Sequence, residues 1–202
     1  MRKYIRQTYN QPASTLLGTY RDADDETYFL NPPYQRGAVW TLTQKRALIK
    51  SFVSNLPTGS IILSVHEECY DHPHVVVVDG KQRIMALREF ASGGFSVPRE
   101  WFDPEDIKEY ARDFHFVIWH ELSERGRRTF ENITLSVIEF VLSRSYIGKG
   151  ENGQSVWVHN DHDTTTRLEA EVYLLINAGG TAHTDEDLAR AIGITETVAE
   201  AD

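Results

Sequence analysis

The sequence predicts an α/β domain, a small mixed sheet with helices packed around it. Segments of strand composition alternate along the chain with helical patterns, and 41% of the 202 residues are hydrophobic, as a globular core requires. The clearest unit begins with four consecutive valines at 75–78, typical of a buried strand. The pair Asp79-Gly80 ends this strand, and apolar residues then recur at helical spacing over 82–91.

The elements expected before this unit are a strand, a helix and a second strand. Residues 1–26 are polar, and their acidic cluster is typical of a solvated turn. A short strand at 27–30 stops at two prolines, which cannot donate ladder hydrogen bonds. Thr43 is the expected N-cap of a helix that reaches about residue 56. A strand at 60–67 then leads through a hairpin loop into the valine strand.

The elements expected after this unit are shorter. Small residues at 92–94 predict a turn. Residues 135–142 could form a strand or a helix, and their β-branched and aromatic residues favour a strand. In chain order we expect a strand at 95–97, a proline-initiated helix at 104–112, a strand at 114–119, a helix at 122–132 and a strand at 135–142.

The last third of the chain begins with residues 143–163, which are rich in Gly, Asn, Asp and His and predict a long loop or insertion. His159 to Asp163 offers metal-ligand residue types, but without a surrounding ββα pattern a solvated loop is preferred. Helices follow at 164–176 and 184–192, the first closed by Asn177 and glycines. The expected organisation is a polar segment at 1–26, one domain at 27–192 and a tail at 193–202.

Composition narrows the functional classes. The formal net charge of −9 argues against a broad, non-specific nucleic-acid surface and leaves room only for a local basic groove. A single cysteine excludes a disulfide framework. No apolar run approaches the roughly 20 residues of a membrane span, and the N-terminus lacks a secretory signal. A cytoplasmic protein without a membrane partner is expected.

The stretch Asp79-Gly80-Lys81-Gln82-Arg83 carries the strongest chemical signal. Backbone N–H groups at a helix start favour anions, and Lys81 and Arg83 add positive charge there, so a phosphate is the expected ligand. The glycine spacing is neither that of a P-loop nor that of a dinucleotide fingerprint. The alternative is a structural turn in which Arg83 pairs with a nearby acid.

A second polar stretch runs from residue 31 to residue 40. Tyr34, Gln35, Arg36 and Trp40 form a compact set that can stack on bases and hydrogen-bond to phosphates or base edges. The alternative is a loop whose Tyr and Trp fill the core.

Together the two stretches resemble the DUF262 family of the ParB/sulfiredoxin-like superfamily. Its members show a P-x-QR-x-x-x-W segment followed by DGQQR, and Lys81 replaces the first Gln of the second motif here. A helix ending at 171–177, followed by glycines and the acidic stretch 185–188, matches a third family feature. The resemblance covers residues 27–192.

The resemblance implies a ParB/sulfiredoxin-like fold and nucleotide chemistry, in domains of restriction systems that attack modified DNA. NTP with Mg²⁺ is the implied cofactor, Asp79 a candidate Mg²⁺ ligand, and DNA an implied partner. The nuclease domain of large family members has no counterpart here, which leaves open a truncated chain, a separate nuclease partner or a member adapted to another reaction. Asp79 would orient water, a hydroxyl or a metal ion, and Arg83 would neutralise developing charge. The implied residues are Asp79, Gln82 and Arg83 for catalysis, Gly80, Lys81, Tyr34, Gln35 and Arg36 for nucleotide binding, and Trp40 and Asn177 for DNA contact.

Three functions follow. The leading one is an NTP-hydrolysing domain that acts on or senses modified DNA in phage–host conflict or DNA modification. The second is a phosphotransferase that uses the same cleft on DNA or a small molecule. The third is a non-catalytic DNA sensor.

Overall fold

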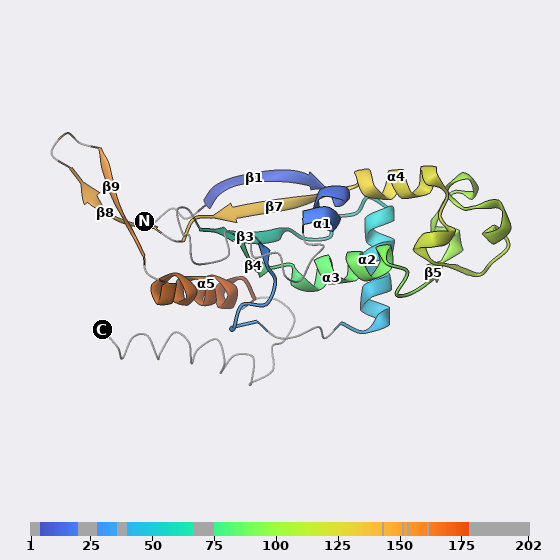
Figure 1. Cartoon of the computed structure of the whole chain (residues 1–202), viewed down its shortest axis with the longest axis horizontal. Helices are drawn as coiled ribbons and strands as arrows, with labels where there is room; N and C mark the ends of the chain where they lie inside the picture. The colour runs from blue at the N-terminus through green and yellow to red at the C-terminus, as the bar shows by residue number, and fades with distance from the viewer. Residues whose placement is uncertain are drawn as a thin grey trace.

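The centre of the fold is a five-stranded mixed sheet with the strand order β1-β7-β3-β4-β2. The structure is a computed structural model that describes residues 5–19, 28–35, 40–66, 75–142, 144–150, 152, 154–160 and 162–177 (Figure 1). The sheet strands are β1 Ile5–Pro12, β2 Tyr28–Phe29, β3 Ile61–Val65, β4 Val75–Asp79 and β7 Thr134–Phe140. The α-helices are α1 Ala13–Thr19, α2 Leu42–Val53, α3 Lys81–Ala91, α4 Glu124–Asn132 and α5 His162–Asn177. The predicted α/β class, with a mixed sheet and surrounding helices, is confirmed.

The sheet mixes both strand orientations. β4 pairs antiparallel with β3, as the predicted hairpin requires, and parallel with the short β2. β7 pairs parallel with β3 on one side and antiparallel with β1 on the other. The valine strand β4 therefore lies between β3 and β2, and its end carries the predicted phosphate motif.

The two faces of the sheet bury two separate cores because successive side chains of a strand point to opposite faces. Ile61 and Val77 contribute to the main core, which helices α1 to α4 cover. Ile62 and Val78 contribute to a smaller core on the other face, where α5 packs. In Figure 1, α5 lies below the sheet, and the other helices lie toward its right-hand end.

Helix ends follow the capping rules, with one correction. The N-cap of α2 is Thr41 rather than Thr43: its hydroxyl accepts from the backbone N–H of Gln44, and the Gln44 side chain accepts from the N–H of Thr41 at 2.9 Å. This reciprocal arrangement uses two N–H groups that have no partner inside the helix. Ser123 caps α4 in the simpler way, by accepting from the N–H of Gly126.

Three predictions for the irregular parts need correction. The polar N-terminus contains β1 and α1, and β1 is an edge strand of the sheet. The expected helix at 104–112 is two separate 3-10 turns, η2 Pro104–Asp106 and η3 Glu109–Ala111. The expected loop at 143–163 is a β-hairpin of β8 Arg144–Lys149 and β9 Ser155–His159, which projects from one end of the molecule in Figure 1.

The remaining short elements lie between α3 and α4. They are β5 Val97–Pro98, η1 Arg99–Trp101, β6 Phe116–Val117 and η4 Trp119–Glu121. The hairpin loop predicted between the strand at 60–67 and the valine strand covers residues 69–73. This loop and the predicted helix at 184–192 lie outside the described residues. Within the part of the chain that the structure describes, no helix is long and apolar enough to span a membrane.

Candidate functional site

The predicted phosphate motif forms a tight strand–turn–helix junction. β4 ends at Asp79, Gly80 adopts a left-handed conformation with φ of 101°, and α3 begins at Lys81. Gly80, the N-cap residue, has no side chain that could cap this helix start. The N–H groups of the first turn point out of the helix start, an orientation that favours an anion, and the Gly80 carbonyl accepts the first helical bond from Ile84 at 3.0 Å.

Arg83 is held in a fixed position above this turn. Its Nη1 donates to the carbonyl of Ser60 at 2.7 Å, and its Nη2 donates to Oδ2 of Asp79 at 2.9 Å. Both side chains of the ion pair are about one-fifth exposed, at 19% and 22%. Arg83 thus pairs with an acid, as the structural alternative predicted, and it remains accessible to a ligand.

Two glycines make room for the Arg83 guanidinium. Gly59 and Gly80 both have positive φ, and a β-carbon on either would lie 3.3 Å or 3.0 Å from an Nη atom of Arg83. A side chain at either position would press on the guanidinium and strain the backbone. The sequence identified Gly80 but not Gly59 or Ser60, because their proximity depends on the pairing of β3 with β4.

Lys81 and Gln82 occupy the first turn of α3. Lys81 is buried, with 7% of its surface exposed, and the loss of solvent lowers the pKa of its ammonium group below the usual value. Gln82 is half-buried. The structure therefore brings together all five residues of the predicted motif, with Lys81 directed into the protein.

Gln35 joins the second polar stretch to this motif. Its side-chain Nε2 donates to the carbonyls of Val77 and Val78, at 2.5 Å and 2.6 Å. Its backbone N–H donates to the carbonyl of Pro32 at 3.0 Å, which closes a turn. The two predicted motifs thus meet at the end of β4, and Gln35 holds the strand that delivers Asp79.

Tyr34 lies in the smaller core rather than in an open cleft. It is fully buried, its ring centroid lies 5.7 Å from that of Tyr173, and its hydroxyl donates to Oε2 of Glu169 at 3.2 Å. The other carboxylate oxygen of Glu169 lies 2.6 Å from Nε2 of His66. Burial and the neighbouring carboxylate raise the pKa of the Tyr34 hydroxyl well above its usual value, so Tyr34 remains a hydrogen-bond donor.

The other predicted contacts lie apart from the motif or outside the described residues. Trp40 packs, partly buried, against the main core, which agrees with the core-filling alternative. Asn177 ends α5 and donates to the carbonyl of Tyr173 at 2.8 Å, within its own helix. Arg36 and Asp161 lie outside the described residues. His66 and Glu169 were not predicted, since no local pattern links residues 103 positions apart.

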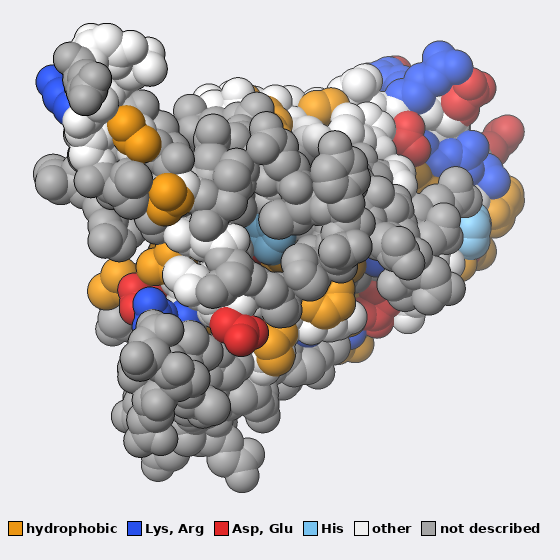
Figure 2. Space-filling view, turned by 60° about the vertical axis from the view of Figure 1, so that its left-hand side comes forward, with side chains coloured by type: hydrophobic (Ala, Val, Ile, Leu, Met, Phe, Trp, Pro, Cys, Tyr) orange, Lys and Arg blue, Asp and Glu red, His pale blue; other side chains and the backbone are white. Residues whose placement is uncertain are grey.

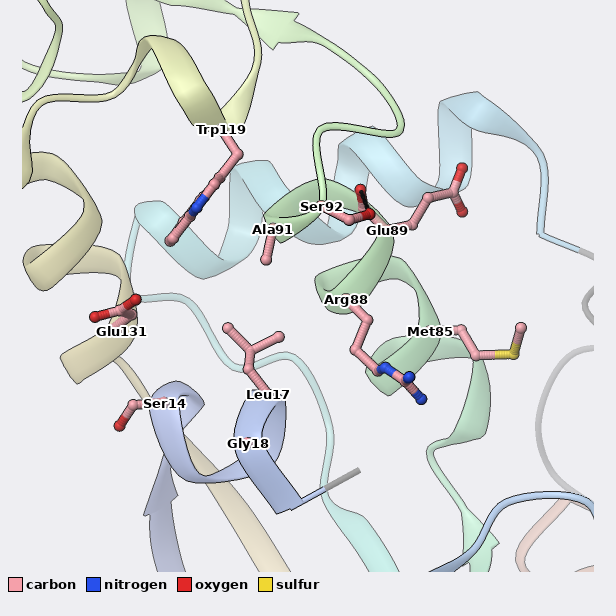
Figure 3. Close-up of a pocket in the computed structure, with 10 residues that line it drawn as sticks. All are labelled: Ser14, Leu17, Gly18, Met85, Arg88, Glu89, Ala91, Ser92, Trp119 and Glu131. Carbon is pink, nitrogen blue, oxygen red and sulfur yellow. Dashed lines mark hydrogen bonds between the residues drawn. The ribbon is translucent and has the colours of Figure 1, made fainter. Parts of the chain in front are cut away.

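A separate cavity of about 850 Å³ lies between α1, α3 and α4, with mixed charged and apolar walls. Figure 3 shows Leu17 of α1, Arg88 of α3 and Trp119 among the side chains that line this cavity. None of the residues Asp79 to Arg83 lines this cavity. It is therefore distinct from the predicted phosphate site.

The described residues could bind Mg²⁺ together with the phosphates of a bound nucleotide. They contain no cluster of three or more His, Cys, Asp or Glu that could hold a metal ion by itself. Asp79 offers one partly exposed carboxylate, whose Oδ2 accepts from Arg83. Since Mg²⁺ commonly binds through one or two carboxylates together with substrate phosphates and water, a single carboxylate beside the turn is compatible with it.

The fold and this junction define an α+β domain in which a strand end, a left-handed glycine and a helix start hold an arginine–aspartate pair. A model of the GmrSD restriction endonuclease N-terminal domain matches residues 15–193, and the chain belongs to this family. The resemblance to the DUF262 type is thereby confirmed. No curated relative and no solved structure matches the chain. The ParB/sulfiredoxin-like assignment and the division at residues 26 and 192 stay predictions.

Family membership connects the chain with a modification-dependent restriction system, a process that acts on DNA. The described surface has no broad basic face in the view of Figure 2, where acidic and basic side chains are mixed at the right-hand end. Two ion pairs illustrate this mixing, Arg125 with Glu105 and Arg128 with Glu124.

Proposed function

We propose that this domain binds a nucleoside triphosphate at the Asp79–Arg83 junction and hydrolyses it in support of restriction of modified DNA. The observation that carries the proposal is the position of Arg83. Its guanidinium is fixed by Asp79 and Ser60 beside the start of α3, where amide groups and the helix dipole favour phosphate. An arginine has five N–H donors, and these two bonds use two of them.

Each residue has a distinct part in this proposal. Arg83 neutralises charge on the phosphoryl oxygens, and the first-turn amides bind the phosphate chain. Asp79 holds Mg²⁺, which supplies positive charge to the phosphates. Gln82, half-buried on the same turn, orients the attacking water. Gln35 takes part indirectly, because it anchors the strand end and leaves the phosphates to its neighbours.

The geometry favours turnover over simple DNA sensing at this site. A sensor would need Tyr34 and Gln35 to face DNA, whereas Tyr34 is buried and Gln35 is bound to backbone carbonyls. Turnover requires instead a rigid, partly open charge pair, and the exposures of Arg83 and Asp79 meet that requirement.

The test compares two arginines that each pair with an acid four residues earlier. Purified protein is assayed with Mg²⁺ and each of the four ribonucleoside triphosphates, with and without DNA. Arg83→Ala should lower turnover by about 100-fold or more. Arg128→Ala removes the exposed pair with Glu124 and should leave turnover unchanged.

Each outcome has a defined meaning. Free phosphate that depends on Arg83 supports hydrolysis. Transfer of labelled phosphate to DNA would replace hydrolysis with the phosphotransferase alternative. The absence of both nucleotide binding and turnover would overturn the proposal and leave a DNA-binding or protein-binding domain.

A further inference from the structure

A buried polar chain links α5 to the candidate site from the opposite face of the sheet. Glu169 uses both carboxylate oxygens: Oε1 lies 2.6 Å from Nε2 of His66, and Oε2 accepts from the hydroxyl of Tyr34 at 3.2 Å. All three residues are buried, with 6%, 2% and 0% of the surface of His66, Glu169 and Tyr34 exposed. The chain thus joins the end of β3, the middle of α5 and the turn that contains Tyr34.

Gln35, the next residue after Tyr34 in the sequence, connects this buried polar chain to the phosphate motif. Gln35 follows Tyr34 in the turn that the Gln35–Pro32 backbone bond closes. The Gln35 side chain is bonded to the carbonyls of Val77 and Val78, the last two residues before Asp79. A displacement of the Tyr34 ring would therefore move the group that holds the strand end, and with it the carboxylate that binds Arg83.

Stability alone does not explain the polar chain. Removing polar and ionisable groups from water costs about as much as their mutual attraction returns, and apolar substitutes of equal volume are often as stable. The hydrophobic cluster on this face of the sheet consists of Ile62, Val78, Ala170, Tyr173 and Tyr34 itself. An apolar residue at 169 would fit this environment, yet it could not fix the direction of the Tyr34 hydroxyl. Hydrogen bonds supply that direction because they require defined geometry.

We propose that Glu169 and His66 are positioning residues, which hold Tyr34 and through Gln35 fix the end of β4 so that α5 controls the geometry of the Asp79–Arg83 site. This inference rests on the proposed function for its catalytic consequence. The mechanical link between α5 and the motif is independent of it. Motion or displacement of α5 would loosen the site without touching the nucleotide.

The experiment uses a matched pair of hydroxyl deletions. Tyr34→Phe removes the bond to Glu169 and retains the ring. Tyr9→Phe removes a bond of the same kind, from the Tyr9 hydroxyl to Glu139 at 2.7 Å, between β1 and β7 at the other side of the sheet. For each variant we would measure the melting temperature, amide hydrogen exchange of peptides that cover residues 77–84, and the kcat and KM of NTP turnover.

Tyr34→Phe should accelerate exchange at residues 77–84 by about tenfold, the equivalent of one lost hydrogen bond, and lower kcat/KM by about tenfold or more. Tyr9→Phe should leave both unchanged. Glu169→Gln should behave like the wild type, because the amide has the shape of the carboxylate and its oxygen can still accept from the Tyr34 hydroxyl. If Tyr34→Phe does not fold, Glu169→Leu is compared with Glu169→Gln in the same way.

Equal exchange at residues 77–84 in Tyr34→Phe and Tyr9→Phe would overturn the inference, whatever the melting temperatures. If the wild type turns over no NTP, the proposed function fails, and the exchange comparison still decides whether α5 and the motif are linked. If turnover occurs and the two variants exchange alike, the proposed function stands and the positioning role fails.

Discussion

Gly80 and Ile61 approach each other so closely that a β-carbon on Gly80 would lie 2.5 Å from Cδ1 of Ile61 and 3.2 Å from its α-carbon. The left-handed φ of Gly80 adds a conformational restriction at the same place. This contact sets how near the helix start can come to β3, and hence how near Arg83 comes to Ser60.

Gly80→Ala should lower the free energy of unfolding by about 1–3 kcal/mol, because backbone strain coincides with a clash against the Ile61 side chain and a tight approach to its α-carbon. It should also abolish the NTP turnover that depends on Arg83. Gly18→Ala is the control, since nothing lies within 4 Å of a β-carbon there and Gly18 is in α1. That change should be neutral or stabilising by up to about 1 kcal/mol. Urea unfolding measures the free energy of unfolding of both variants. Equal stability of Gly80→Ala and Gly18→Ala would contradict the assignment of strain to Gly80.

Gln35→Glu should destabilise the protein more than Gln35→Ala does. A carboxylate at this position would face the carbonyl oxygens of Val77 and Val78, and both are acceptors. Gln35→Ala should cost about 1–3 kcal/mol through the loss of these two hydrogen bonds. Gln7→Ala, at an exposed bond to Glu139, should cost less than about 0.5 kcal/mol. Chemical denaturation at pH 7 provides the comparison, and the reverse order of Glu and Ala would show that Gln35 does not donate to these carbonyls.

Lys81→Gln should stabilise the protein at neutral pH, and the gain should shrink as the pH rises toward 10.5. Burial lowers the pKa of Lys81 in the folded state, so the unfolded chain binds the proton more tightly. The resulting penalty is present below the folded pKa and disappears as the pH passes the unfolded value of 10.5. The melting temperatures of the wild type and of Lys81→Gln, compared from pH 7 to pH 10.5, measure this penalty. The exposed Lys149→Gln serves as control, and a gap that widens with pH would contradict the prediction.

Asp106→Asn should show the opposite pH dependence. Burial, with a contribution from Asp103, raises the pKa of Asp106 although Nε of Arg125 lies 3.3 Å from its Oδ1. The charged form is therefore costly in the fold above the folded pKa, and the cost is absent below the unfolded value of 3.8. The variant should be more stable than the wild type at pH 7 and equally stable near pH 3.5. A constant difference across this range would assign the effect to packing.

The sequence predicts the parts of the fold that local patterns control. The valine strand, the glycine turn and the helix after it are recognisable because their residues are contiguous, and so is the strand β7. β1 was missed because an edge strand buries little: within Ile5–Pro12, Tyr9 is partly buried against the core and its neighbours are polar. The β8–β9 hairpin had a usable signal in Asn152-Gly153, a pair that favours hairpin turns.

The sequence identified the two motifs of the candidate site but not the contact between them. Residues Asp79 to Arg83 and the neighbourhood of Gln35 were identified, but their junction at the carbonyls of Val77 and Val78 depends on strand order. The sequence assigned Tyr34 to nucleotide binding, but an aromatic ring suits a binding site and a hydrophobic core equally well. The structure buries Tyr34 in the smaller core, and this burial depends on the assembled sheet, which a local sequence pattern does not show.

The pairing of β1 with β7 also determines when the sheet can be completed during synthesis. Ile5 is paired with Phe140 and Pro12 with Thr134, so β1 leaves the ribosome well before its partner β7. Contacts between residues so far apart in sequence slow folding, because a long loop must close before they form. The β3–β4 pair is available much earlier, and the turn at Gly80 lies at its end. The nascent chain can therefore build its phosphate-motif hairpin while the N-terminal strand is still unpaired.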